Sequence, residues 1–167
     1  FMATALLLID RSTLSMRRAR TIADRGYFLH QVAIADLQDR LEMITKPLPD
    51  IAIVTGHPAP WAKAFPTAQV VPDDEVLNLS PNSNDLVIHA MSLHWANDPL
   101  GQMIQCHRAL RPDGLFLASL LGGKTLHELR TALAEAETIV RGGVSPRVLP
   151  MADIRDLGAL LSRAGFN

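Results

Sequence analysis

The stretch DLVIHAM at residues 85–91 is the clearest indication of how this chain folds. A short, almost wholly apolar run of this kind is typical of a strand that is buried on both faces of a parallel sheet. Similar runs occur at residues 51–54, 69–71 and 115–121, separated by helical patterns or turn-rich loops. This alternation predicts a three-layer α/β fold with a mostly parallel sheet.

Two helices are expected before the first strand, over residues 17–25 and, after Gly26, through Ile44. The first of them is basic. Its arginines could bind an anion, but a solvated helix face is the expected arrangement for such a cluster. The arginines concerned are Arg17, Arg18, Arg20 and Arg25.

Four further helices are marked by residues that favour helix ends. Proline at the first helical position, a polar N-cap and a Thr–Glu capping box open helices, while glycine closes them. The signals are Pro58, Asn97 or Asp98 before Pro99, Thr125 with Glu128, and Asp153 with a stop at Gly165.

Length and composition limit the classes of protein. The 167 residues predict a single domain, 1–167, with N-terminal helices over 1–46 and an α/β core over 51–167. A net charge of -1 argues against a nucleic-acid partner, and the early apolar run at residues 5–9 is too short to span a membrane. The single cysteine, Cys106, fits buried packing and a reducing compartment, which predicts a cytoplasmic protein.

The loops after the predicted strands carry the candidate binding residues. In parallel α/β sheets, ligands bind at the carboxyl ends of the strands. A glycine there allows close approach, a carboxylate can accept hydrogen bonds from sugar hydroxyls or an adenine amine, and an aromatic ring can cover the site. This pattern predicts a nucleotide-like ligand, with Gly56, Asp73, Asp74, His89, Ala90 and Trp95 as cofactor-binding residues.

Three motifs carry a resemblance to a known superfamily. The stretch DLVI at 85–88, LHW at 93–95 with Asn97 and Asp98, and RALRPDG at 108–114 resemble class I S-adenosylmethionine-dependent methyltransferases. The resemblance implies a Rossmann-like methyltransferase fold, S-adenosylmethionine as cofactor and a methyl acceptor that is a small molecule, carrier or protein.

Further motifs narrow the resemblance to two branches of that superfamily. They are IDR at 9–11 with RRAR at 17–20, GGKTLHELR at 122–130 and GVSPR at 143–147. They resemble the carrier-methylating enzyme of biotin synthesis and the methyltransferase-like assembly factor of respiratory complex I. The second branch implies an alternative function, that of an assembly factor or protein arginine hydroxylase without methyl transfer.

The chain departs from the superfamily pattern in the part of the fold that would bind the nucleotide. The loop after residue 54 keeps one glycine, Gly56, where the superfamily has several. A parallel crossover needs a dozen or more residues, so the segment 55–69 has room for one crossover where the superfamily has two. The sequence therefore predicts a sheet shortened by one strand-helix unit.

The lost strand-helix unit leaves two roles open for the acidic loop, Asp73 to Glu75, which follows the predicted strand 69–71. By motif, Asp73 would meet the adenine amine. By geometry, a right-handed crossover places residues 70–71 beside the first strand, where Asp73 or Asp74 would take over the ribose. The resemblance also implies closing strands beyond Asn167, so the fold within this sequence is expected to lack them and to leave a sheet edge open to a second copy or a protein partner.

Methyl transfer needs alignment of the acceptor and exclusion of water, and requires neither a nucleophilic side chain nor a metal. If a base acts, His94 and His89 are the catalytic candidates, because histidine titrates near neutrality; both could instead be orienting or structural residues. Their spacing does not match a zinc site, and none is predicted.

Overall fold

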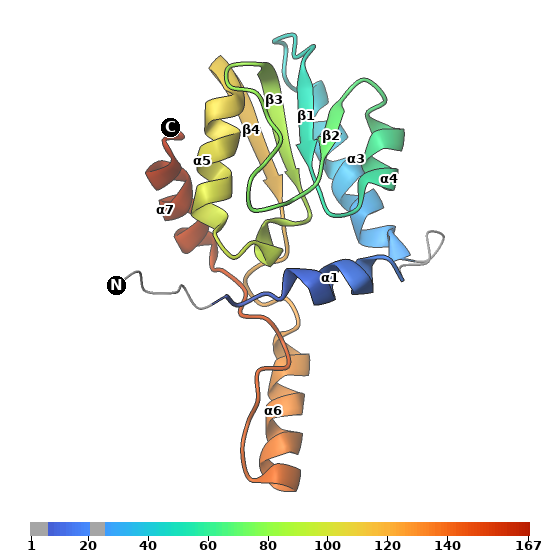
Figure 1. The fold of residues 1–167 in the computed structure, drawn as a ribbon, viewed down its shortest axis with the longest axis vertical. Helices are drawn as coiled ribbons and strands as arrows, with labels where there is room; N and C mark the ends of the chain where they lie inside the picture. The colour runs from blue at the N-terminus through green and yellow to red at the C-terminus, as the bar shows by residue number, and fades with distance from the viewer. Residues whose placement is uncertain (1–6, 21–25) are drawn as a thin grey trace.

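The computed structural model describes residues 7–20 and 26–167 (Figure 1). Its centre is a parallel sheet of β1 (Ile51–Val54), β2 (Gln69–Val71), β3 (Asn84–Ala90) and β4 (Leu110–Ser119). The strand order is β2-β1-β3-β4. The predicted α/β fold with a parallel sheet is confirmed.

Helices cover both faces of this sheet, as buried strands require. On one face α3 (Phe28–Glu42) and α4 (Pro58–Ala64) bury Ile53, Leu86 and Ile88 together with Trp61. On the other face α5 (Pro99–Ala109) packs on the residues that alternate with these, and α7 (Ile154–Ala164) packs on α5 (Figure 1). Cys106 lies in this second layer with no exposed surface, which confirms the predicted packing role.

The shortened part of the sheet, β1 and β2, has the predicted topology. The segment between β1 and β2 holds the single helix α4, and β2 pairs directly with β1 in the register Val54 to Val71. The expectation that one crossover places residues 70–71 beside the first strand is therefore confirmed. As a result, the acidic loop that follows β2 lies at the carboxyl end of β1.

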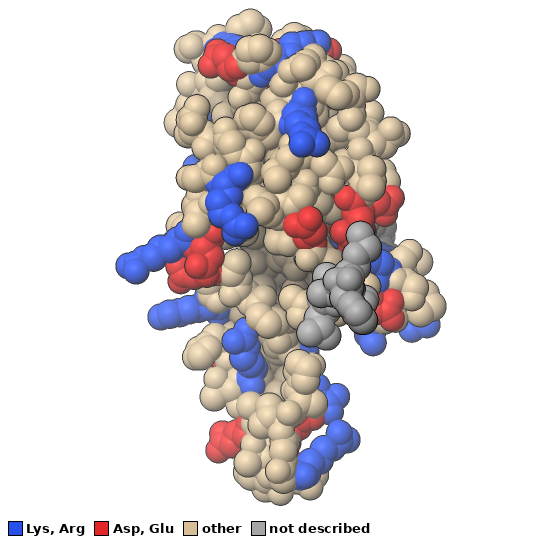
Figure 2. All heavy atoms as spheres, turned by 60° about the vertical axis from the view of Figure 1, so that its left-hand side comes forward, with Lys and Arg blue, Asp and Glu red and all other residues tan. Residues whose placement is uncertain are grey.

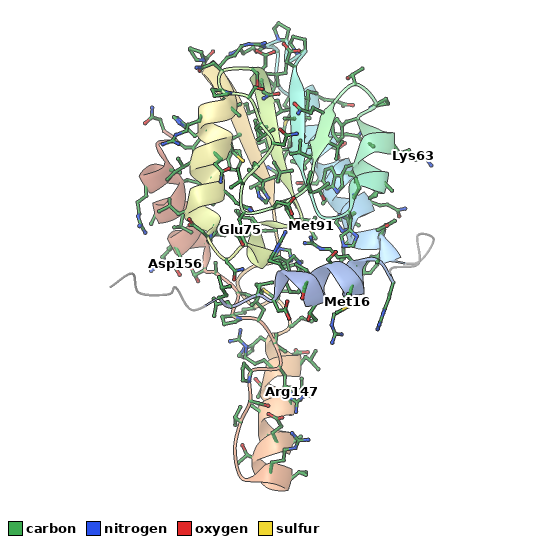
Figure 3. The ribbon with its side chains drawn as sticks, viewed as in Figure 1. Met16, Lys63, Glu75, Met91, Arg147 and Asp156 are labelled. Atoms are coloured by element: carbon green, nitrogen blue, oxygen red, sulfur yellow. The ribbon has the colours of Figure 1, made fainter. Side chains whose placement is uncertain are left out.

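The N-terminal helix α1 (Arg11–Arg18) starts earlier than the predicted basic helix because Asp10 caps it. The Asp10 carboxylate accepts hydrogen bonds from the backbone N–H groups of Ser12 and Thr13. The rest of that prediction, residues 21–25, lies outside the described residues. In Figure 3 Met91 follows the carboxyl end of β3 and Met16 lies on α1 below it, so α1 crosses the sheet at the carboxyl ends of its strands.

Two of the predicted caps form and one does not. Asp98 and Asp153 cap α5 and α7, and Gly165 ends α7 in the left-handed conformation. The Thr125 capping box is wrong, because α6 (His127–Arg141) begins after Leu126, and the Thr125 hydroxyl donates to the carbonyl of Gly122 at 2.7 Å.

The last strand is also longer than predicted. β4 starts at Leu110 instead of Leu115, because the turn at Asp113, which has a positive φ of 63°, is absorbed as an irregularity in the pairing with β3.

Helix α6 stands away from the rest of the molecule (Figure 1). No residue of α6 is buried. Ile139 and Val140 are 78% and 79% exposed. Among the described residues no helix is both long and apolar enough to cross a membrane.

Candidate functional site

A cavity of about 580 Å³ lies at the carboxyl ends of β1 and β2. One wall is the loop after β1 together with the acidic loop after β2, and the opposite wall is α1. The volume falls in the range of about 300 to 1,000 Å³ that is usual for small-molecule sites. Three of the predicted cofactor-binding residues line it: Gly56, Asp73 and Asp74.

Asp73 is held by two arginines of α1. Arg18 donates to both carboxylate oxygens at 2.7 and 2.8 Å, and Arg11 donates to the same oxygens at 3.2 and 3.4 Å. A carboxylate offers about four acceptor positions, so the two arginines occupy all the acceptor positions of Asp73. Burial raises the pKa of the Asp73 carboxyl, but the hydrogen bonds from Arg18 and Arg11 outweigh it and the pKa is lowered overall.

Arg18 also occupies the space above Gly56. A side-chain carbon added at Gly56 would lie 2.1 Å from Cζ of Arg18, so the guanidinium rests against the glycine backbone. The Arg18 side chain is only 14% exposed. The expectation that this arginine belongs to a solvated helix face is therefore wrong, because its ion pair with Asp73 draws it under α1.

Aromatic and histidine rings form the rim of the cavity next to α3 and α4. Tyr27 and His57 line the cavity, and the His57 ring lies 4.9 Å from that of His30. Nδ1 of His30 accepts a hydrogen bond from Nε1 of the buried Trp61 at 3.0 Å. Burial, with the charges of His57 and Arg18, lowers the pKa of His30 to about 4, so the His30 ring is uncharged at neutral pH.

His89 and Ala90 lie inside the molecule and do not line the cavity. Both are fully buried in β3. Nε2 of His89 lies 2.8 Å from Oε1 of Gln102, whose amide nitrogen donates to the carbonyls of Asp73 and Asp74. His89 is thus in position to hold the acidic loop through Gln102, and burial lowers its pKa to about 4.

His94 and Trp95 belong to the short helix η1 (Leu93–Trp95), on the opposite side of the site from α4. Their rings lie 5.2 Å apart. Nδ1 of His94 accepts a hydrogen bond from the backbone N–H of Leu121 at 3.4 Å. Burial lowers the pKa of His94 to about 4. Trp95 is not among the residues that line the Asp73 cavity.

Sequence reasoning missed the polar side chains that organise the site from a distance. Arg11 and Arg18 reach Asp73 across more than 50 positions of the chain, and Gln102 supports the acidic loop from α5. The side chain of Asn97 binds both the N–H and the carbonyl of Ile9, at 2.9 and 3.1 Å. The motifs IDR and RRAR were the only local signal, since they contain both arginines.

No group of three histidine, cysteine or carboxylate side chains suited to a metal ion occurs in the described ranges 7–20 and 26–167. The thiol of Cys106 is buried in the core, and burial raises its pKa to about 12. The lining of the cavity offers the guanidinium groups of Arg11 and Arg18, the carboxylates of Asp73 and Asp74, and the imidazole of His57.

Comparison with known proteins matches residues 54–118 to the family described as "Methyltransferase domain". The human protein named arginine-hydroxylase NDUFAF5, mitochondrial, is 48% identical over 103 residues, which cover 62% of this chain and 30% of that protein. Malonyl-[acyl-carrier protein] O-methyltransferase of Gallionella capsiferriformans is 36% identical over 111 residues, covering 64% of this chain and 36% of the relative. The chain spans about a third of the length of these curated relatives.

Solved structures share the fold at low sequence identity. A SAM-dependent methyltransferase of Thermotoga maritima, described as a possible histamine N-methyltransferase, superposes with a TM-score of 0.57 at 14% identity, over 87% of this chain and 76% of its own. The chain therefore shares the α/β fold of this solved structure, and its residues 54–118 are similar to the methyltransferase domain family. In sequence the chain is similar to both NDUFAF5 and malonyl-carrier-protein O-methyltransferase.

Proposed function

We propose that this chain provides the cofactor-binding core of a methyltransferase that uses S-adenosylmethionine. The observation that carries the proposal is the cavity at the carboxyl ends of β1 and β2, lined by Gly56, Asp73 and Asp74, in a chain whose residues 54–118 match the methyltransferase domain family. In parallel α/β folds this edge of the sheet is where nucleotide-like ligands bind.

The residues of the cavity fit such a cofactor on one condition. The carboxylates of Asp73 and Asp74 can accept hydrogen bonds from an adenine amine or ribose hydroxyls, and Arg11 and Arg18 can donate to a carboxylate. Arg18 must first leave Gly56, because its guanidinium fills the space through which a ligand would approach that backbone. The cofactor supplies a methyl group already activated on sulfur, so the chain needs to align the acceptor and exclude water.

His94 and His89 contribute to this function in different ways. We expect His94, which is half-buried, to face the reacting groups and His89, which is fully buried against Gln102, to act as a positioning residue for the acidic loop. Trp95 stays in the proposal as a residue that flanks the cofactor, whereas the fully buried Ala90 does not reach the cavity.

Calorimetric titration of the native chain with S-adenosylmethionine and S-adenosylhomocysteine tests the proposal. Micromolar binding is expected, and replacing Gly56 by alanine should weaken it by about tenfold or more, which corresponds to 1.4 kcal/mol. The matched control is Gly158→Ala in α7, where an added side-chain carbon meets open space. Absence of binding to the folded native chain would exclude methyl transfer.

A second candidate is a methyltransferase-like assembly factor or protein arginine hydroxylase. Two observations favour it: the 48% identity to a protein named arginine-hydroxylase, and the full use of the Asp73 carboxylate by Arg18 and Arg11. Mass spectrometry of an arginine-containing acceptor protein separates the candidates. A gain of one methyl group supports the first, and a gain of one oxygen atom supports the second.

The acceptor is proposed to be a small molecule, carrier or protein rather than a nucleic acid. Basic and acidic side chains are interspersed on the face shown in Figure 2, and the net charge of the chain is -1. Binding of nucleic acid needs a basic surface to neutralise phosphates. A filter-binding assay with duplex DNA and with RNA at low salt should therefore detect no complex.

The edge strand β4 is proposed to be covered by a second copy of the chain or by a protein partner. β4 is the last strand of the described sheet, and most of its residues are only half-buried. An open edge of this kind is a site for pairing with another chain. Sedimentation of the native protein should show a species larger than the monomer, alone or with its partner.

The compartment is proposed to be reducing, as in the cytoplasm, because the one cysteine is a buried free thiol. The similar NDUFAF5 proteins are named as mitochondrial. Fractionation of cells expressing the native gene tests this proposal.

A further inference from the structure

A second, smaller cavity of about 160 Å³ lies on the other side of η1 from the Asp73 site. Its walls come from the N-terminal segment, from η1 and the residues that follow it up to Pro99, from the loop after β4, and from α7 with the segment 149–152 before it. Nearly all of the lining is apolar, and among the described residues that form it His94 is the only titratable one. The principal apolar residues are Leu8, Ile9, Leu93, Leu120, Leu157 and Leu160.

The hydrogen bond that His94 makes determines what its ring offers to this cavity. The backbone N–H of Leu121 donates to Nδ1, so the neutral imidazole carries its proton on Nε2. In the described part of the chain, Arg18 Nε is the only buried side-chain polar atom without a hydrogen-bond partner. Nε2 of His94 also makes no hydrogen bond to a described residue, but it is not one of the fully buried atoms, so in the lining of the cavity it can donate to a ligand.

The two cavities share one wall. Asn97 binds the N–H and carbonyl of Ile9 and so fixes the segment that lines the apolar cavity. Two residues further along, Arg11 is bonded to Asp73 in the polar cavity. The charges of Arg18 and Asp73 also act on the His94 ring, which places this histidine within electrostatic reach of both sites.

We propose that the apolar cavity binds an apolar group of the methyl acceptor, about the size of a phenyl ring or a branched six-carbon chain, with Nε2–H of His94 donating to a polar atom beside it. The size follows from volume, since an apolar cavity of about 150 Å³ stays dry and binds benzene. That the apolar group belongs to a methyl acceptor rests on the proposed function, whereas the binding of an apolar group of this size by the cavity does not.

Benzyl alcohol is the test ligand, because it combines a phenyl ring with a hydrogen-bond acceptor. It is titrated into the native chain while the amide signal of Leu121, which reports on the His94 ring, is followed by NMR. A saturable shift is expected, and toluene, which lacks the hydroxyl, should bind about three to ten times more weakly. A shift that grows linearly without saturation would overturn the proposal.

Two substitutions that fill the cavity show where the ligand binds. Leu157→Phe should weaken benzyl alcohol binding by about tenfold or more, and Ala96→Leu, which narrows another wall, is the second variant should the first fail to fold. The matched control is Leu129→Phe on α6, an exposed leucine outside this cavity. Unchanged binding in a folded cavity variant would overturn the assignment.

The same protein is titrated with S-adenosylmethionine so that the two proposals can fail separately. Benzyl alcohol binding without cofactor binding would keep the cavity and reject methyl transfer. Cofactor binding without saturable benzyl alcohol binding would reject the cavity and keep the proposed function.

Discussion

The two cavities at the carboxyl edge of the sheet differ in the chemical character of their linings. The larger one contains a carboxylate and two arginines that satisfy each other, while the smaller is lined by leucines around one neutral histidine. Both are closed by the same N-terminal segment, which runs from Leu8 to Arg18. The difference indicates that the polar cavity must break an internal ion pair before it can use its charges, whereas the apolar cavity is already formed.

Removing the carboxylate of Asp73 is the largest expected disturbance of the polar cavity. In Asp73→Ala, Arg18 loses its partner while it remains mostly buried, and breaking a buried pair in this way costs about 3 kcal/mol of unfolding free energy. Chemical denaturation measures this loss. The same substitution should also weaken S-adenosylmethionine binding more than the control does.

The control is Glu75→Ala, two residues further along the same loop, where the carboxylate accepts one exposed hydrogen bond from Asn97. Its expected cost is below about 1 kcal/mol. Equal and small losses in the two variants would mean that the Asp73 ion pair does not hold the polar cavity together.

Asn97→Ala tests the wall that the two cavities share. The variant loses both hydrogen bonds to Ile9, so a loss of about 1 to 2 kcal/mol in unfolding free energy is expected. Proteolysis near Leu14 should become faster, because the N-terminal segment is released. Asn78→Ala is the matched control, and identical cleavage rates in the two variants would show that Asn97 does not fix the segment.

Acid should affect the Asp73 ion pair and the His94 ring in separate pH ranges. The pKa of His94 is lowered from 6.5 to about 4 by burial, so the folded state favours the neutral ring. Its contribution is complete above pH 6.5 and is lost as the pH falls towards 4. The pKa of Asp73 is also lowered, and that contribution is complete above the unfolded-state value near 3.8 and is lost only below it.

Denaturation midpoints between pH 7 and pH 3 measure this separation. In His94→Gln, the loss of unfolding free energy between pH 7 and pH 4.5 should be smaller than in the native chain by roughly 1 kcal/mol, which allows for the partial exposure of the ring. His127→Gln on exposed α6 is the control. If both variants kept the native pH profile, the neutral state of His94 would not contribute to stability.

The features that the sequence predicted correctly are those decided by neighbouring residues or by chain length. Asp98 and Asp153 cap helices because their carboxylates reach N–H groups within three positions. β2 lies beside β1 because the segment between them is long enough for one crossover only. Thr125 was misread, since the loop that precedes it offered its hydroxyl a carbonyl at Gly122 instead of a helix terminus.

The interior of the candidate site was not predictable in the same way. The pairing of Arg18 with Asp73 joins residues 55 positions apart, and such a contact leaves no local pattern. Predicting Gly56, Asp73 and Asp74 at one cavity needed only the rule for strand ends. Predicting that the Asp73 carboxylate is already fully bonded would have required knowing where α1 lies.

A change of salt concentration is expected to give the smallest effect on stability, and it separates exposed ion pairs from buried ones. Raising the ionic strength from about 0.1 M to about 1 M shortens the Debye length from about 10 Å to about 3 Å, which weakens exposed ion pairs and has little effect on buried ones. Arg111 pairs with Asp50 and Asp85 at the surface, where its side chain is 40% exposed. The stability difference between the native chain and Arg111→Met should therefore shrink by up to about 0.5 kcal/mol at high salt. The corresponding difference for Asp73→Ala should stay constant, because Asp73 is 3% exposed. If that difference shrank as much, water would reach the arginines of the polar cavity, and the ion pair would present no barrier to a ligand.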